Sequence, residues 1–350
     1  MSHREHFGNP MIEQRKLLSG EAVAILEPKA IFEVSGEDRL KWLHSLLSQN
    51  IINLAAGDST EALLLDANGR IEQIIHVYVD AESVWLTVSE ARGAALLAWL
   101  QKMVFRSKVE ITDRSQDFTA VATFKQPLRQ DGVAVRLSWR DPWPVVQPGG
   151  VRYASSQPQF VSWVYFENLV PTEAVTGLEA NWQAEGNLAG SLALDALRVA
   201  HWRPGEAELD DRSLPHELDL LATSVHLSKG CYRGQETVAK VHNLGHPPRR
   251  LVFLHLDGSG HEIPAVGASV NIVAEGETKQ VGQITSVAQH FESGPIALAV
   301  VSRSTPVEAE FLVIDQNGSQ IAATQEVIVP PTAGKAANLP PRRNLMGGRA

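Results

Sequence analysis

The last third of the chain limits the possible folds most strongly, because it contains short strand-like segments and no helical pattern. The candidate strands lie between residues 250 and 329, and turns rich in Gly, Asn and Pro separate them. One turn, Asn317-Gly318, is a strong hairpin signal since both residue types tolerate positive φ. Evenly spaced short strands without intervening helices predict a small antiparallel β-barrel.

The first 125 residues show a different pattern, in which strand-like and helix-like segments alternate. Strands are expected there at residues 21–26, 31–34, 61–66, 71–79, 83–88, near 109 and at 119–124, and a helix at 89–102. In the less regular middle of the chain, a helix is expected at residues 191–202. The segment Ser35-Gly36-Glu37-Asp38 resembles a capping box and predicts the start of a further helix. These elements together predict an α+β architecture with mostly antiparallel strand pairing.

Composition narrows the class of protein. A chain of 350 residues with 44% hydrophobic residues can bury two or three domain cores. Its formal net charge of -9 argues against broad nucleic-acid binding, although it leaves room for a local basic pocket. The sequence contains one cysteine, no apolar run of about 18 residues and no signal-peptide pattern at its start. We therefore expect a cytoplasmic protein without disulfides and without a membrane partner.

The segment with the most chemical information surrounds that cysteine, Cys231. Lys229 and Arg233 lie two residues away on either side, and nearby cations stabilise a thiolate. The pattern therefore indicates a reactive thiol, which we treat as the candidate catalytic group. The alternative is that Cys231 is a buried small apolar residue, which is the usual state of a free cysteine.

The neighbours of Cys231 add binding groups. Gly230 and Gly234 would let the backbone approach a ligand closely. Gln235 and Glu236 offer amide and carboxylate groups that can pair with the edge of a heterocycle.

The whole segment resembles the K-G-C-[FY]-x-G-Q-E signature of the YgfZ family, the folate-binding relatives of the glycine-cleavage T protein; it reads Lys229-Gly230-Cys231-Tyr232-Arg233-Gly234-Gln235-Glu236. Four further stretches are similar to segments of that family: Gly36-Glu37-Asp38-Arg39, Leu65-Asp66-Ala67-Asn68-Gly69-Arg70, Asp195-Ala196-Leu197-Arg198-Val199-Ala200 and Leu214-Pro215-His216-Glu217. The resemblance extends over nearly the whole chain, from residue 20 to residue 330.

The resemblance implies a fold of three lobes around a central channel, of which two are α+β and the third is a C-terminal β-barrel. It also implies that the channel holds tetrahydrofolate or a derivative, and that the protein supports the assembly or repair of iron–sulfur enzymes. On this basis the expected folate-binding residues are Lys229, Gly230, Tyr232, Arg233, Gly234, Gln235, Glu236 and Arg198. The expected partners are folate and iron–sulfur enzymes or their assembly proteins.

Two departures separate the chain from the aminomethyltransferases of the wider group. Gln73 stands where those enzymes have their catalytic aspartate, and a carboxamide cannot act as a general base. Ala200 stands where they have a glutamate that faces the pterin. Both departures favour an accessory protein over a glycine-cleavage transferase, and the question whether it is an enzyme stays open.

Other candidate sites are weaker. His242 and His246 have the spacing of zinc ligands on a helix, but Gly245 and the following prolines argue against a helix there. Arg249-Arg250 would be either a solvated turn or a contact for the glutamyl tail of folate. One cysteine cannot hold an iron–sulfur cluster, so any handling of clusters would be transient, through a partner, or across a dimer.

The sequence thus predicts three parts. Residues 1–245 would form two interleaved lobes around the folate channel, 246–330 the barrel, and 331–350 a disordered tail. The first functional hypothesis is a folate-binding accessory protein for iron–sulfur enzymes. The alternatives are a tetrahydrofolate-dependent aminomethyltransferase-like one-carbon transferase and a binding module that takes no folate.

Overall fold

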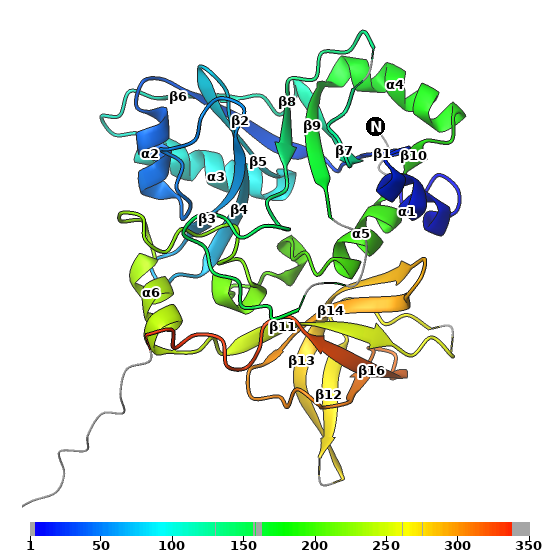
Figure 1. Cartoon of the computed structure of the whole chain (residues 1–350). Helices are drawn as coiled ribbons and strands as arrows, with labels where there is room; N and C mark the ends of the chain where they lie inside the picture. Colours follow the sequence, from blue (N-terminus) through cyan, green and yellow to red (C-terminus); the bar gives the residue numbers. More distant parts are fainter. Residues whose placement is uncertain are drawn as a thin grey trace, which may run out of the picture.

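The computed structural model describes residues 4–129, 131–156, 158, 163–260, 262–274 and 276–337. In these residues the chain forms three lobes, which contain two five-stranded sheets and a closed six-stranded barrel (Figure 1). No helix among them is both long and apolar enough to cross a membrane.

The first lobe is an antiparallel sheet covered on one face by helices. Its strands, in spatial order, are β3 (Ser59–Leu65), β4 (Ile71–Val79), β5 (Ser83–Ser89), β2 (Lys29–Ser35) and β6 (Glu110–Asp113). Ile75 and Val77 on β4 point into a core with Leu43 of α2 (Arg39–Leu46) and Leu96 of α3 (Glu90–Met103). Because side chains alternate along a strand, the other face of β4 is left for the neighbouring lobe.

The second lobe has a mixed sheet. Its strands, in spatial order, are β10 (Leu188–Ala189), β1 (Val23–Ile25), β7 (Phe118–Phe124), β9 (Tyr165–Pro171) and β8 (Leu137–Arg140). The pair β1–β10 is parallel, whereas the other neighbours are antiparallel. The apolar face of α4 (Thr172–Ala184) packs on this sheet, and α1 (Pro10–Ser19) contacts α5 (Ser191–Ala200).

The third lobe is the barrel. Its strands, in spatial order, are β11 (Arg249–Leu256), β14 (Gly294–Ser302), β13 (Glu277–His290), β12 (Ser269–Ala274), β15 (Phe311–Ile314) and β16 (Gln320–Val327). Val252 and Leu254 on β11 fill the core of the barrel, whereas Leu251 and Phe253 point outward into a second core. The connection from the α+β lobes contains η1 (Glu206–Glu208), η2 (Pro215–Leu218) and α6 (Gln235–Leu244).

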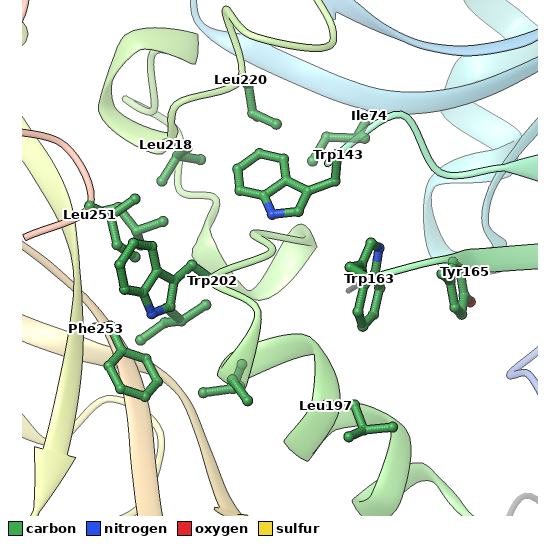
Figure 2. Packing of buried hydrophobic residues seen from close by; sticks show 14 of the residues in the cluster. Ile74, Trp143, Trp163, Tyr165, Leu197, Trp202, Leu218, Leu220, Leu251 and Phe253 are labelled. Carbon is green, nitrogen blue, oxygen red and sulfur yellow. The ribbon is translucent and has the colours of Figure 1, made fainter. Parts of the chain in front are cut away.

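That second core joins all three lobes. Figure 2 shows Ile74 of β4, Trp163 just before β9, Leu197 of α5 and Phe253 of β11 in one apolar cluster, with Trp202 close to the barrel. The same cluster holds Trp143, Leu218, Leu220 and Leu251. The lobes are therefore joined by packed side chains and not only by loops.

The expected α+β fold with a C-terminal antiparallel barrel is confirmed, but some local expectations were wrong. The helix after β2 has Asp38 as its N-cap, with no side-chain cap bond, and Ser35 still belongs to the strand. The reason is Gly36, whose φ of +105° holds it against the backbone of Lys108. The helices α1, α4 and α6 were not anticipated from the sequence.

The expected tail also needs a correction for residues 331–337, which the structure describes. The amides of Lys335, Ala336 and Ala337 donate to carbonyl groups of Gly245, His242 and Asn243 at the end of α6. These bonds satisfy carbonyls that a helix end leaves without partners. Residues 338–350 lie outside the described part of the chain.

Candidate functional site

A cavity of about 390 Å³ lies where the two α+β lobes meet α5. Its wall includes side chains from β2, β3 and β4 of the first sheet, from β9 of the second sheet and from α5. The volume falls in the range of about 300–1,000 Å³ that is common for small-molecule sites. We take this central cavity as the candidate site.

One part of the wall is aromatic. The ring of His76 on β4 stacks on Trp139 with a centroid distance of 3.7 Å and an interplanar angle of 3°. Trp163 and Tyr165 stack at 5.1 Å and 20°. The indole of Trp139 is held by a bond of 2.7 Å to the carbonyl oxygen of Thr60. The site therefore has flat, fixed apolar faces.

A second part of the wall is charged and buried. Arg203 pairs with Glu61 and donates through Nε to Asp141 Oδ2 at 2.9 Å. Glu61 also accepts a bond of 2.5 Å from the hydroxyl of Ser224. Burial raises the pKa of Glu61, but the charges of Arg203 and His76 outweigh it, and the net pKa is lowered. The carboxylate of Glu61 therefore stays ionised although it is fully buried.

Glu167 on β9 is the second buried carboxylate that faces His76. Its Oε2 lies 3.0 Å from His76 Nδ1, and its Oε1 accepts from the Tyr165 hydroxyl at 3.1 Å and lies 3.7 Å from Lys29 Nζ. Burial raises the pKa of Glu167, but Lys29 and His76 lower it by more. The imidazole of His76 is thus held between two carboxylates, with Nε2 at 3.7 Å from Glu61 Oε2.

Arg198 is the one expected folate-binding residue that lines this cavity. Its guanidinium donates to Glu208 Oε2 at 3.0 Å, to the carbonyl oxygen of Arg203 at 3.0 Å and to Ser286 Oγ on β13 at 2.7 Å. The side chain therefore braces the cavity wall against the barrel and not against the cysteine segment.

The signature residues 229–236 lie elsewhere, around the start of α6. Gly234 is the N-cap of this helix and has a φ of +84°. A Cβ atom on it would lie 2.6 Å from the carbonyl oxygen of Asp66 and 2.9 Å from Gly69 Cα, in the turn between β3 and β4. Gln235 and Glu236 form the first turn of α6. None of these eight residues lines the central cavity.

Lys229 fixes the segment to the first lobe. Its ammonium group donates to the carbonyl oxygens of His44, Leu47 and Gln49 at 2.5, 2.5 and 3.0 Å, at the end of α2. Burial lowers the pKa of Lys229 to about 8. Its three donors are thus taken by backbone, which a helix C-terminus favours because of its negative dipole end.

Cys231 lies on the surface between two fixed points. Lys229 and Tyr232 are buried, whereas Gly230 and Cys231 are exposed. Arg233 forms an ion pair of 3.0 Å with Glu72. The buried-residue alternative for Cys231 is thereby ruled out, and the thiol is open to solvent.

The two positions that differ from the aminomethyltransferases also lie outside the cavity. Gln73 pairs across the sheet with Leu64, which belongs to the helix-covered core, whereas its neighbour Ile74 lines the cavity. Ala200 is fully buried in the core shared by the lobes.

The weaker candidates are partnered in other ways. His242 lies on α6, contrary to the expectation of no helix there, and its Nδ1 is 2.8 Å from the Tyr153 hydroxyl. His246 Nδ1 lies 2.6 Å from the carbonyl oxygen of Ala333. In the described residues no group of three metal-ligating side chains comes together. Arg249 pairs with Asp210 and Glu217, whereas Arg250 is fully buried.

Sequence reasoning missed the cavity residues Glu61, His76 and Glu167. Each is an ionisable residue in a strand whose residues are mostly apolar, and this was the signal available. Charged residues are almost never fully buried unless they are paired, so such positions indicate a site.

Comparison with known proteins gives matches of several kinds. The GCVT N-terminal domain family model matches residues 21–124. A chloroplast protein of Arabidopsis thaliana, whose name assigns it to the transferases only provisionally, is 27% identical over 77% of this chain and 62% of its own length. A mitochondrial iron–sulfur cluster assembly factor IBA57 homolog of Mycosarcoma maydis is 26% identical over 68% of this chain and 58% of its own length. The chain spans less than two thirds of these two relatives.

Another relative and one solved structure match over more of their length. The tRNA-modifying protein YgfZ of Edwardsiella ictaluri is 24% identical over 82% of this chain and 86% of its own length. The crystal structure of the glycine cleavage system aminomethyltransferase T from Bartonella henselae has a TM-score of 0.67 at 18% identity, covering 92% of this chain and 89% of that one. The likeness in structure concerns the fold.

Proposed function

Because the chain belongs to the YgfZ family of glycine-cleavage T-protein-like proteins, we propose that it is a folate-binding accessory protein that supports the assembly or repair of iron–sulfur enzymes. The observation that carries this proposal is the central cavity, which combines flat aromatic walls with buried carboxylates. The names of the relatives supply the link to iron–sulfur assembly.

The residues of the cavity fit a reduced folate. Its pterin ring is flat and carries N–H donors along one edge, and Glu167 has acceptor sites in the cavity wall, since an ionised carboxylate offers about four lone-pair positions. Trp139 and Trp163 supply faces for stacking. Lys29 and Arg198, which are only partly buried, would meet the carboxylates of the glutamyl tail at the mouth.

An accessory role is favoured over a transferase role because Gln73 and Ala200 lack the carboxylates of the aminomethyltransferases and do not line the cavity. One observation keeps a one-carbon transferase as the second candidate: Glu61 and Glu167 bring other carboxylates into the cavity. Turnover of a methylene group on bound folate would distinguish the transferase from the accessory protein.

We assign Cys231 to contact with a client protein, because its thiol is exposed and lies in a segment outside the cavity. Lys229, Gly230, Tyr232, Arg233, Gly234, Gln235 and Glu236 would then shape and present the thiol. The YgfZ relatives also carry tRNA modification in their name. With 40 acidic and 31 basic residues, we propose that any such role runs through a client enzyme in the cytoplasm and not through contact with RNA.

The test separates the two sites. Calorimetric titration with tetrahydrofolate is expected to give saturable binding to the wild type and to Cys231→Ala alike. In cells that lack the wild-type protein, Cys231→Ala is expected to leave the activity of iron–sulfur enzymes low. Absence of binding by the wild type would remove folate from the proposal, and full enzyme activity with Cys231→Ala would remove the thiol.

A further inference from the structure

The buried charges around His76 do not balance without a proton. Three buried carboxylates line the inner wall, on Glu61, Asp141 and Glu167. The permanent cations that pair with them are Arg203 and Lys29. A proton on His76 makes this set neutral, since uncompensated charge in a buried site is costly.

No other group that faces the ring changes this balance. Tyr165 is buried beside Glu167, and burial raises its pKa well above the usual value, so the phenol stays neutral. The groups of β2, β3 and β9 that face His76 are those already named: Lys29, Glu61 and Glu167. Three further carboxylates, on Glu27, Asp195 and Glu206, line the cavity. Asp195 lies beside Arg198, and Glu206 lies beside Arg92.

The geometry lets His76 lose that proton from one nitrogen only. Nδ1 is fixed by Glu167 at 3.0 Å, and the ring plane is fixed by Trp139. Nε2 lies 3.7 Å from Glu61, beyond hydrogen-bond distance, and the side chain is 16% exposed. The arrangement holds the Nδ1–H tautomer when neutral and leaves the Nε2 lone pair toward the cavity.

Building on the folate-binding proposal, we propose that the cavity selects a folate whose ring system carries a positive charge, and that His76 releases its Nε2 proton to solvent when this cation enters. The folate form of that kind has a methenyl bridge between N5 and N10, over which one positive charge is delocalised. No bond of the ligand changes in this step, and the net charge of the cavity is the same before and after. A neutral ring, as in tetrahydrofolate, leaves the His76 proton in place.

The experiment compares the two ligands by calorimetry in slightly acidic buffer, in which the methenyl bridge hydrolyses slowly. Titrations in two buffers of different ionisation enthalpy give the number of protons released. For the wild type we expect the methenyl form to bind about tenfold more tightly than tetrahydrofolate, with release of about one proton per ligand. For His76→Gln we expect the methenyl form to bind without that proton release.

His255→Gln is the matched control, because His255 also pairs with a glutamate, Glu326 at 2.5 Å, but on the barrel. It is expected to behave as the wild type. If tetrahydrofolate binds as tightly as the methenyl form, or if proton release persists in His76→Gln, the inference is overturned while the folate-binding proposal stands. If neither ligand binds, both fail. If His76→Gln does not fold, the wild type alone tests the inference. Its affinity ratio for the two folates and the number of protons released on binding then support it or overturn it.

Discussion

Replacing Gly234 by alanine is expected to destabilise the protein by about 2–5 kcal/mol, whereas the same change at Gly230 is expected to cost less than about 0.5 kcal/mol. Two physical effects contribute to the destabilisation at Gly234. A side chain at a φ of +84° costs about 1–2 kcal/mol. The new Cβ would also approach the Asp66 carbonyl oxygen to 2.6 Å, and relief of such overpacking costs about 1–3 kcal/mol.

Gly230 is a control in the same segment, because a Cβ atom there would meet nothing within 4 Å. The measurement is the free energy of unfolding by urea for the wild type and both variants. The slope of this free energy against urea concentration should be the same for all three proteins. Equal stabilities for the two variants would refute the claim that the second glycine of the signature is required by its contact with the turn between β3 and β4.

Two further changes test other contacts. Lys229→Met should lower the free energy of unfolding by about 2–3 kcal/mol, because three backbone carbonyls lose a charged donor. The control is Lys41→Met on the exposed face of α2. Equal effects of the two substitutions would contradict the structural role of the Lys229 ammonium group. Asp219 is buried and its pKa is raised from 3.8 to about 6, mainly by that burial. The native state therefore holds more protons than the unfolded state in this interval, so stability falls as pH rises from about 4 to about 6, by about 3 kcal/mol relative to Asp219→Asn. The free energy of unfolding is measured against pH for the wild type and for Asp219→Asn. If the difference between them does not change with pH, the Asp219 carboxyl does not titrate in this way.

The barrel and the first sheet could be predicted from the sequence because their signals are local. Alternating apolar residues and turns such as Asn317-Gly318 define short strands without reference to distant parts of the chain. The helix α1 was missed although its ends carry clear signals: Asn9 caps its start and accepts from the Met11 amide, and Gly20 ends it with a φ of 79°. Local capping signals alone are therefore enough to predict this helix.

The central cavity could not be predicted in the same way. His76 and Glu167 are 91 positions apart, and Glu61 meets Arg203 across 142 positions. Only the packing of one lobe on the other brings them together. The cysteine segment drew attention because it is contiguous, whereas the cavity residues are single positions on separate strands. Contiguity in sequence therefore identified the exposed segment and missed the enclosed site.

The apolar cluster of Figure 2 has a consequence for how the molecule can be divided. Phe253 and Leu251 on the outside of the barrel face Trp202 and Leu218 of the preceding chain. A cut near residue 246 would therefore expose two large apolar surfaces and would not release two finished domains. The barrel is better regarded as the closing wall of one folding unit than as a portable module. A lineage that lost the barrel would also have to rebuild the surface that it covers.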